Sequence, residues 1–142
     1  MGSRNTGRMA RVMARLIAGM NDKSINYPKR GEVWQVSLEH VVGREIGKTR
    51  PALIISNDKN NEYSSTVTLI PITGSIEKIY PFEVFISKLE SGLPLDSKLK
   101  CNQIRTVDKL RLSKVVGEIP EEIIKKVEKA VLIHLEISES II

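Results

Sequence analysis

A charged loop between two glycines holds the densest set of chemically useful side chains in the sequence. From Gly43 to Pro51 it carries three cations and one carboxylate within seven positions, which are Arg44, Glu45, Lys48 and Arg50. Guanidinium groups form paired, charge-assisted hydrogen bonds to phosphate oxygens, so such a cluster suits a polyanion. Pro51 fixes its own φ and keeps Arg50 out of the helical region. We therefore expect Arg50 to be held rigidly at a junction between loop and strand.

The net charge of +5 is concentrated at the amino end of the chain. Residues 1–26 hold five basic side chains and one acid, which leaves residues 27–142 close to neutral. A polyanion site there must come from local clustering, and the charged loop is the best candidate. We interpret residues 1–26 as a basic extension outside the core, either disordered or helical. It could bind nucleic acid or act as a transit peptide, but a leader or an upstream start is favoured.

Other reactive side chains are few. Cys101 is the only cysteine, so no internal disulfide can form, and we expect it to pack inside the fold, with a thiol nucleophile as the lesser alternative. His40 and His134 lack any metal-ligand spacing, so we predict no metal and no other cofactor. The apolar runs are too short to span a membrane, and we expect a cytoplasmic protein.

The hydrophobic pattern predicts one mainly β domain over residues 27–142. About six short strands follow one another at residues 31–38, 51–56, 66–73, 82–86, 98–104 and 114–119, separated by polar segments. Pro71 cannot donate a ladder hydrogen bond, so its strand should be an edge or bulged at that point. A helix should begin at Pro120 and cover the resulting barrel with one apolar face.

Five motifs, in this order along the chain, resemble the MazF/PemK (Kid-like) toxins of bacterial toxin–antitoxin systems. They are Arg30-Gly-Glu-Val-Trp, Gly43-Arg-Glu-Ile-Gly-Lys-Thr-Arg-Pro, Leu69-Ile-Pro-Ile-Thr, Tyr80-Pro-Phe-Glu-Val and Asn102-Gln-Ile-Arg-Thr-Val-Asp. The resemblance covers roughly residues 28–137 and leaves the segment before Tyr27 without a counterpart. It implies a small SH3-like barrel with a C-terminal helix, and a homodimer. It also implies a metal-independent endoribonuclease that cuts single-stranded RNA, stops translation and growth, and is neutralised by a cognate antitoxin.

The resemblance assigns roles to three residues of the chain. Metal-free RNA cleavage uses the neighbouring 2′-hydroxyl as nucleophile, so the protein must supply proton transfer and stabilise the charge on the phosphorane. Arg50 matches the family's catalytic arginine, and Thr73 matches a threonine that could donate a hydrogen bond to the same phosphate. Glu45 matches a glutamate that is a candidate base or RNA contact.

The sequence departs from the Kid-like pattern before the Gln-x-Arg-Thr motif. The basic residue and the acid that those relatives use for acid–base chemistry are here Lys100 and Asn102, and an amide cannot accept a proton at neutral pH. The base is therefore Glu45, Arg50 or another group. We expect RNA contacts from six further residues, namely Arg44, Lys48, Lys100, Asn102, Gln103 and Arg105. Tyr63 and Tyr80 are the candidates for stacking on bases.

Two other functions remain open on the sequence alone. A CcdB-like toxin of the same superfamily poisons DNA gyrase without cutting RNA, although Arg50 and Thr73 argue for a phosphate site that such a toxin does not need. An SH3-like module that binds peptides is the third reading. The low aromatic content of 4% makes a peptide groove a poor match.

Overall fold

The structure, a computed structural model, describes residues 27–138, so the interpretations of residues 1–26 lie outside it. It is mainly β with a C-terminal helix, as predicted, and has seven strands instead of about six. The strands are β1 (Glu32–Ser37), β2 (Thr49–Ile54), β3 (Thr66–Thr73), β4 (Glu83–Ile86), β5 (Ser97–Lys100), β6 (Arg105–Asp108) and β7 (Leu112–Glu118). The helices are α2 (Asp58–Tyr63), α3 (Lys88–Ser91) and α4 (Glu121–Leu135), with short 3-10 turns η2 (Cys101–Gln103) and η3 (Lys109–Arg111).

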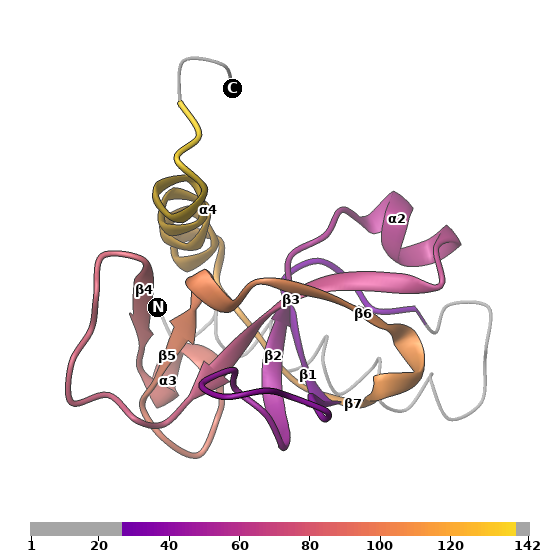
Figure 1. Cartoon of the computed structure of the whole chain (residues 1–142), viewed down its shortest axis with the longest axis horizontal. Helices are drawn as coiled ribbons and strands as arrows, with labels where there is room; N and C mark the ends of the chain where they lie inside the picture. Colours follow the sequence, from indigo (N-terminus) through magenta and orange to yellow (C-terminus); the bar gives the residue numbers. More distant parts are fainter. Residues whose placement is uncertain (1–26, 139–142) are drawn as a thin grey trace.

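Strand β3 is the centre of an antiparallel sheet (Figure 1). It pairs with β2 on one side, and on the other side first with β6 and then with β5. The hydrogen-bonded order is β4-β5-β3-β2-β1-β7, with β6 beside β3, and within residues 27–138 this path does not close. The predicted mainly β fold is confirmed, but its sheet is not closed over these residues, because β6 and β7, which η3 joins, pair with different strands.

The prediction for Pro71 is confirmed by the way β3 changes partner. Pro71 lies opposite Ala52 of β2. On its other side, β6 pairs with residues up to Leu69, and β5 begins at Ile72. Pro71, which has no N–H to donate, thus lies where the partner of β3 on that side changes from β6 to β5. No ladder hydrogen bond is therefore lost.

Local structure differs from the sequence predictions in three places. The polar segment 57–65 contains α2, whose first turn is capped by the Asn57 side chain accepting from the Asn60 amide at 2.8 Å. The strand expected over 98–104 ends at Lys100 and continues as η2, and the next residues form β6. Pro120 is the N-cap of α4, one position before the helix, where its extended backbone leads into the first turn.

Two apolar clusters cover opposite faces of β2 and β3. The first contains Leu53, Ile70 and Ile72 and is completed by the buried side of α4, with Ile123, Ile124, Val127 and Ala130. The second contains Val36, Ala52, Ile54 and Leu69. Figure 1 shows α4 beside β4 and β5, and α2 beside the start of β3. No helix of residues 27–138 is long and apolar enough to span a membrane.

Candidate functional site

Arg50 and Thr73 come together at the ends of two paired strands. The register of β2 and β3 sets Ala52 opposite Pro71, and Arg50 and Thr73 each lie two residues beyond this pair on their own strand. Side chains alternate between faces along a strand, so both lie on the face that buries Ala52 and Leu69. Both also line a pocket of about 230 Å³. Its other walls come from Pro51, Ile72 and the segment Leu93-Pro94-Leu95.

The Arg50 side chain is tied to the charged loop. Its Nε donates to the Gly47 carbonyl oxygen at 2.8 Å, and its backbone pairs with Val36 of β1. The side chain is half-buried, and no carboxylate forms an ion pair with it among residues 27–138. A fixed, uncompensated guanidinium beside a pocket is suited to an anionic group.

The loop that carries the other charges has a constrained backbone. Gly43 and Lys48 have positive φ values of 58° and 67°. Lys48 is held in this conformation because its carbonyl accepts from the Leu38 amide at 2.8 Å and its amide donates to Glu39 at 2.7 Å. A Cβ at Gly47 would lie 2.7 Å from a methyl of Val41, so a larger residue there would displace the loop. The backbone of Lys48 is thus bound, whereas its side chain is exposed to solvent.

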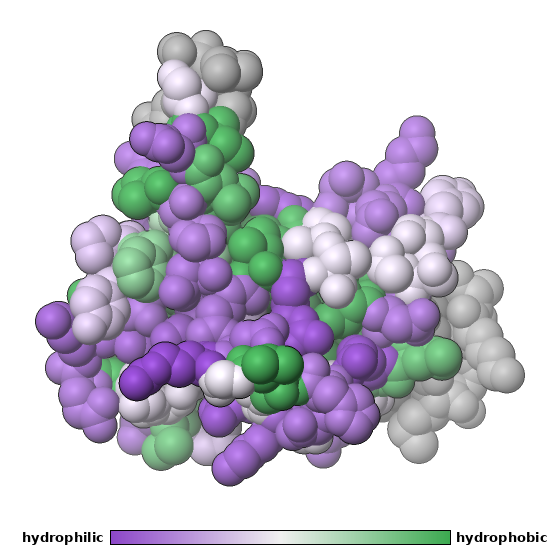
Figure 2. Space-filling model, viewed as in Figure 1, coloured by the Kyte–Doolittle hydropathy of each residue, from purple (hydrophilic) through white to green (hydrophobic). Residues whose placement is uncertain are grey.

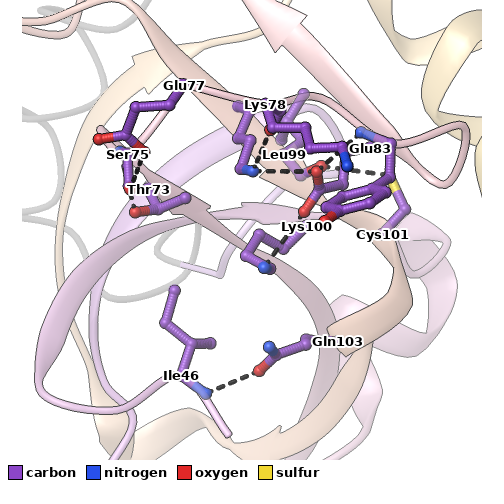
Figure 3. Close-up of polar contacts among 12 residues, drawn as sticks. Ile46, Thr73, Ser75, Glu77, Lys78, Glu83, Leu99, Lys100, Cys101 and Gln103 are labelled. Atoms are coloured by element: carbon purple, nitrogen blue, oxygen red, sulfur yellow. Dashed lines mark hydrogen bonds and ion pairs between the residues drawn. The ribbon is translucent and has the colours of Figure 1, made fainter. Parts of the chain in front are cut away.

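Gln103 binds the backbone of the same loop, and Arg105 binds Leu38, which follows β1. The Gln103 side-chain oxygen accepts from the backbone amide of Ile46 at 2.7 Å (Figure 3). Arg105 donates through Nη1 to the Leu38 carbonyl at 3.3 Å. Gln103 thus supports the loop directly, whereas Arg105 acts through Leu38, whose amide donates to the Lys48 carbonyl at 2.8 Å. Their expected contacts with RNA stay predictions.

Glu45 and Arg44 are exposed at the tip of the loop. One carboxylate oxygen of Glu45 accepts from the Val42 amide at 2.8 Å, which orients the side chain within its own turn. Gly47, two residues after Glu45, accepts the hydrogen bond from the Arg50 side chain, so both residues are attached to the same loop.

A buried carboxylate that the sequence reasoning overlooked lies next to Lys100. Glu83 of β4 forms ion pairs with Lys98 at 2.9 Å and with Lys100 at 3.1 Å (Figure 3). Burial would raise the pKa of Glu83, but hydrogen bonds from the Tyr80 amide and from Lys98, together with the positive charge of Lys100, outweigh it and hold the pKa below its ordinary value. The sequence signal for such a buried acid is the spacing of Lys98 and Lys100. They are two positions apart in β5, which places both ammonium groups on one face of the strand.

Cys101 and Asn102 follow Lys100 in η2 and differ in their surroundings. Cys101 is fully buried, and burial, followed by the negative charge of Glu83, raises the pKa of its thiol to about 12. The packing role expected for Cys101 is therefore confirmed, and the thiol nucleophile is ruled out. Asn102 is half-buried, and its side-chain oxygen has no hydrogen-bond partner within residues 27–138.

The two tyrosines proposed to stack on bases lie in different places. Tyr63 ends α2, near the start of β3, whereas Thr73 ends that strand, about 23 Å away at the usual rise per residue. Tyr63 is thus far from the pocket. Tyr80 stacks on Phe82 with ring centroids 5.4 Å apart and lies in the segment that covers Glu83.

No cluster of three or more potential metal ligands exists among the described residues. In the view of Figure 2, hydrophilic side chains dominate the face crossed by β3 and β5, whereas apolar residues gather along α4. The exposed apolar residues of α4 and its C-terminal end are Ile133, Leu135 and Ile137. Leu135 continues the apolar spacing of the buried residues of α4, but it is 50% exposed.

Comparison with known proteins identifies relatives across most of the chain. Residues 29–135 match the model of the PemK-like, MazF-like toxin of type II toxin–antitoxin systems. The chain is 34% identical over 114 residues to the endoribonuclease MazF9 of Mycobacterium tuberculosis, which covers 77% of this chain and 97% of that relative. It is 40% identical over 108 residues to the endoribonuclease EndoA of Bacillus subtilis, covering 75% of this chain and 93% of the relative.

Solved structures share the fold at lower identity. A crystal structure of MazF from Deinococcus radiodurans superposes with a TM-score of 0.70 at 23% identity, covering 78% of this chain and 98% of that one. An endoribonuclease in complex with its cognate antitoxin, from a mycobacterial species, gives a TM-score of 0.65 at 23% identity, covering 78% of this chain and 97% of that one. The expected β class with a C-terminal helix is therefore confirmed by independent structures.

Proposed function

The chain belongs to the PemK-like, MazF-like toxins of type II toxin–antitoxin systems, and from this premise we propose that it is an endoribonuclease that cuts RNA at the pocket of Arg50 and Thr73. The observation that carries the proposal is the half-buried Arg50, tethered to Gly47 and without a counter-ion among residues 27–138. The pocket beside it suits a phosphodiester, whose charge increases as the phosphorane forms.

Arg50 and Thr73 stabilise the phosphate in this scheme. The RNA 2′-hydroxyl loses its proton to the base and attacks the adjacent phosphorus, and the bond to the 5′-oxygen breaks. The departing 5′-oxygen takes a proton from water, so the products end in a 2′,3′-cyclic phosphate and a 5′-hydroxyl. Arg50 donates two charge-assisted hydrogen bonds to the non-bridging oxygens, which become more negative in the transition state. The Thr73 hydroxyl accepts from the Ser75 amide at 3.3 Å and keeps its own proton to donate to the same phosphate.

Glu45 is the group we assign to accept the 2′-hydroxyl proton. Asn102 cannot accept a proton, and Glu83 is buried between two lysines. Glu45 is exposed and belongs to the loop that binds Arg50 through Gly47. This connection supports a carboxylate and a guanidinium acting on one phosphate.

The remaining contacts follow from the charges around the pocket. We assign contacts with the phosphate backbone of single-stranded RNA to the exposed Arg44 and Lys48 and to Lys100. Contacts that position the RNA strand are assigned to Asn102, Gln103 and Arg105. A homodimer and a cognate antitoxin are the partners that the family membership supports. The gyrase-poisoning alternative is not favoured, since the curated relatives above are endoribonucleases.

End-mapping of a long RNA treated with the purified protein tests this function. We expect breaks at discrete sequences, with cyclic phosphate and 5′-hydroxyl ends, and equal rates with and without EDTA. The protein with Arg50→Ala is the control for a contaminating nuclease. Intact RNA together with inhibited gyrase supercoiling would overturn the proposal in favour of the alternative.

A further inference from the structure

We propose that the buried Glu83 and Lys98 form a positioning pair that holds the Lys100 ammonium group at the RNA site and leaves its positive charge available to phosphate. The inference rests on the proposed function for its catalytic consequence. Its structural part, the fixing of Lys100, concerns three side chains of β4 and β5 only.

The three side chains meet through the register of the two strands. Glu83 lies opposite Lys100, and Phe85 lies opposite Lys98. The other edge of β5 pairs with β3, and there Lys98 lies opposite Thr73. Directly opposite residues share a face of the sheet, so the cluster lies on the same face as Thr73. In the view of Figure 3, the Lys100 side chain lies between Thr73 and the contact of Ile46 with Gln103.

Burial distinguishes the roles of the two lysines. The side chains of Glu83 and Lys98 are 1% and 9% exposed, whereas that of Lys100 is 23% exposed. Lys98 also donates to the Lys78 carbonyl at 2.7 Å, so its ammonium is bound on two sides. Lys98 is therefore committed to the interior, and Lys100 is the member that a ligand can reach.

The charges of the cluster explain why two lysines are present. A buried pair of Glu83 and Lys100 alone would be neutral and would offer little attraction to phosphate. With Lys98 as the counter-ion of the carboxylate, the three groups carry a net charge of +1 that lies on their most exposed member. The Tyr80 amide, which donates to Glu83 at 3.0 Å, fixes the carboxylate further. Lys100 is thereby both held in place and charged.

The test replaces the buried pair without touching Lys100. Glu83→Gln alone would leave Lys98 buried without a partner and could unfold the protein, whereas the double variant Glu83→Gln/Lys98→Met removes both charges together, which is often tolerated. Lys100→Met, the triple variant and Glu128→Gln complete the set. Glu128 of α4 is the control, because its carboxylate forms an ion pair with Arg30 at 2.7 Å, outside the site. Thermal unfolding checks that each variant is folded.

Two readouts decide the inference. The first is NMR relaxation of the Lys100 side chain, labelled at Cε and Nζ, without RNA. We expect a restricted ammonium in the wild type and a mobile one in the double variant. The second is single-turnover cleavage, in which the double variant should lose about tenfold to a hundredfold in rate, since small misplacements cost that much. In the Lys100→Met background the same two substitutions should cause no further loss.

The outcomes separate this inference from the proposed function. Equal Lys100 mobility in wild type and double variant overturns the positioning role whether or not RNA is cut. The positioning role is also overturned if the rate losses of Lys100→Met and of the double variant multiply in the triple variant. Such losses indicate a general structural effect. A restricted Lys100 in a wild type that leaves RNA intact supports the positioning pair and contradicts the proposed function.

Discussion

Gln103 binds the backbone amide of Ile46 across 57 positions of sequence, at 2.7 Å. This single hydrogen bond joins the Gln-x-Arg-Thr motif to the loop that carries Glu45 and binds Arg50. The two motifs are therefore joined in the fold, and a side chain from η2 helps to position the loop.

Replacing Gln103 by Leu should loosen the loop with little effect on the remaining fold. Loss of one partly buried hydrogen bond is expected to cost about 1 kcal/mol of unfolding free energy. Hydrogen exchange should accelerate at the Ile46 amide, and RNA cleavage should slow several-fold. Thr106→Val is the control, since it removes a hydrogen bond to Thr68 on the neighbouring strand. Unchanged protection of Ile46 would contradict the role given to Gln103.

Arg50→Ala should abolish most cleavage while the protein stays folded. Loss of the main donor to the phosphorane is expected to lower kcat by about a hundredfold to a thousandfold. Arg50→Lys keeps the charge without the planar fork and should recover only part of the rate. Lys125→Ala, an exposed lysine of α4, is the control for general loss of charge. Full activity of Arg50→Ala would refute the assignment of this pocket.

Glu45→Gln tests the proton acceptor. The amide keeps the shape of the side chain and can still accept from the Val42 amide, so the turn should persist. Loss of a general base should lower kcat by about a hundredfold or more, with little change in RNA affinity. Single-turnover rates and binding of a 2′-deoxy substrate analogue separate the two effects. An unchanged single-turnover rate would assign the proton to another group.

Glu83 should make stability depend on pH in the acid range. Its pKa in the folded protein lies below the ordinary value of 4.5, so its stabilising contribution is complete above that value and is lost as pH falls through the folded pKa. Urea unfolding between pH 7 and pH 3 should show a steeper loss in the wild type than in Glu83→Gln/Lys98→Met. Parallel curves would contradict the prediction.

Cys101 should resist alkylation in the native protein. Because the pKa of the folded thiol is raised to about 12, iodoacetamide at pH 8 should react only on unfolding. The same shift means that stability should fall as pH rises above 9, the ordinary value of a thiol, toward 12. Mass spectrometry of native and urea-treated samples checks the first point. Rapid labelling of native protein would contradict the burial of this residue.

Several features of the site could be predicted because they depend on neighbouring residues. Pro51 after Arg50 indicated a rigid junction, and Arg50 indeed belongs to β2. The β-branched residues of segment 66–73 predicted the bounds of β3. The helix α2 was missed because its signal is one capping residue, Asn57, in a polar segment. Strand β6 was missed because its residues alternate only weakly, and its pairing with β3 is what makes it a strand.

The sequence by itself determined the alternating strands, the amphipathic C-terminal helix, the family and the presence of a cationic loop, since each depends on local spacing or on motifs. Tertiary structure decided which of these charges meet. It placed Arg50 and Thr73 at one pocket, Gln103 on Ile46, and Glu83 between Lys98 and Lys100. The physical reason is that strand register joins residues far apart in the chain, and only that register assigns each alternating side chain a neighbour and a degree of burial.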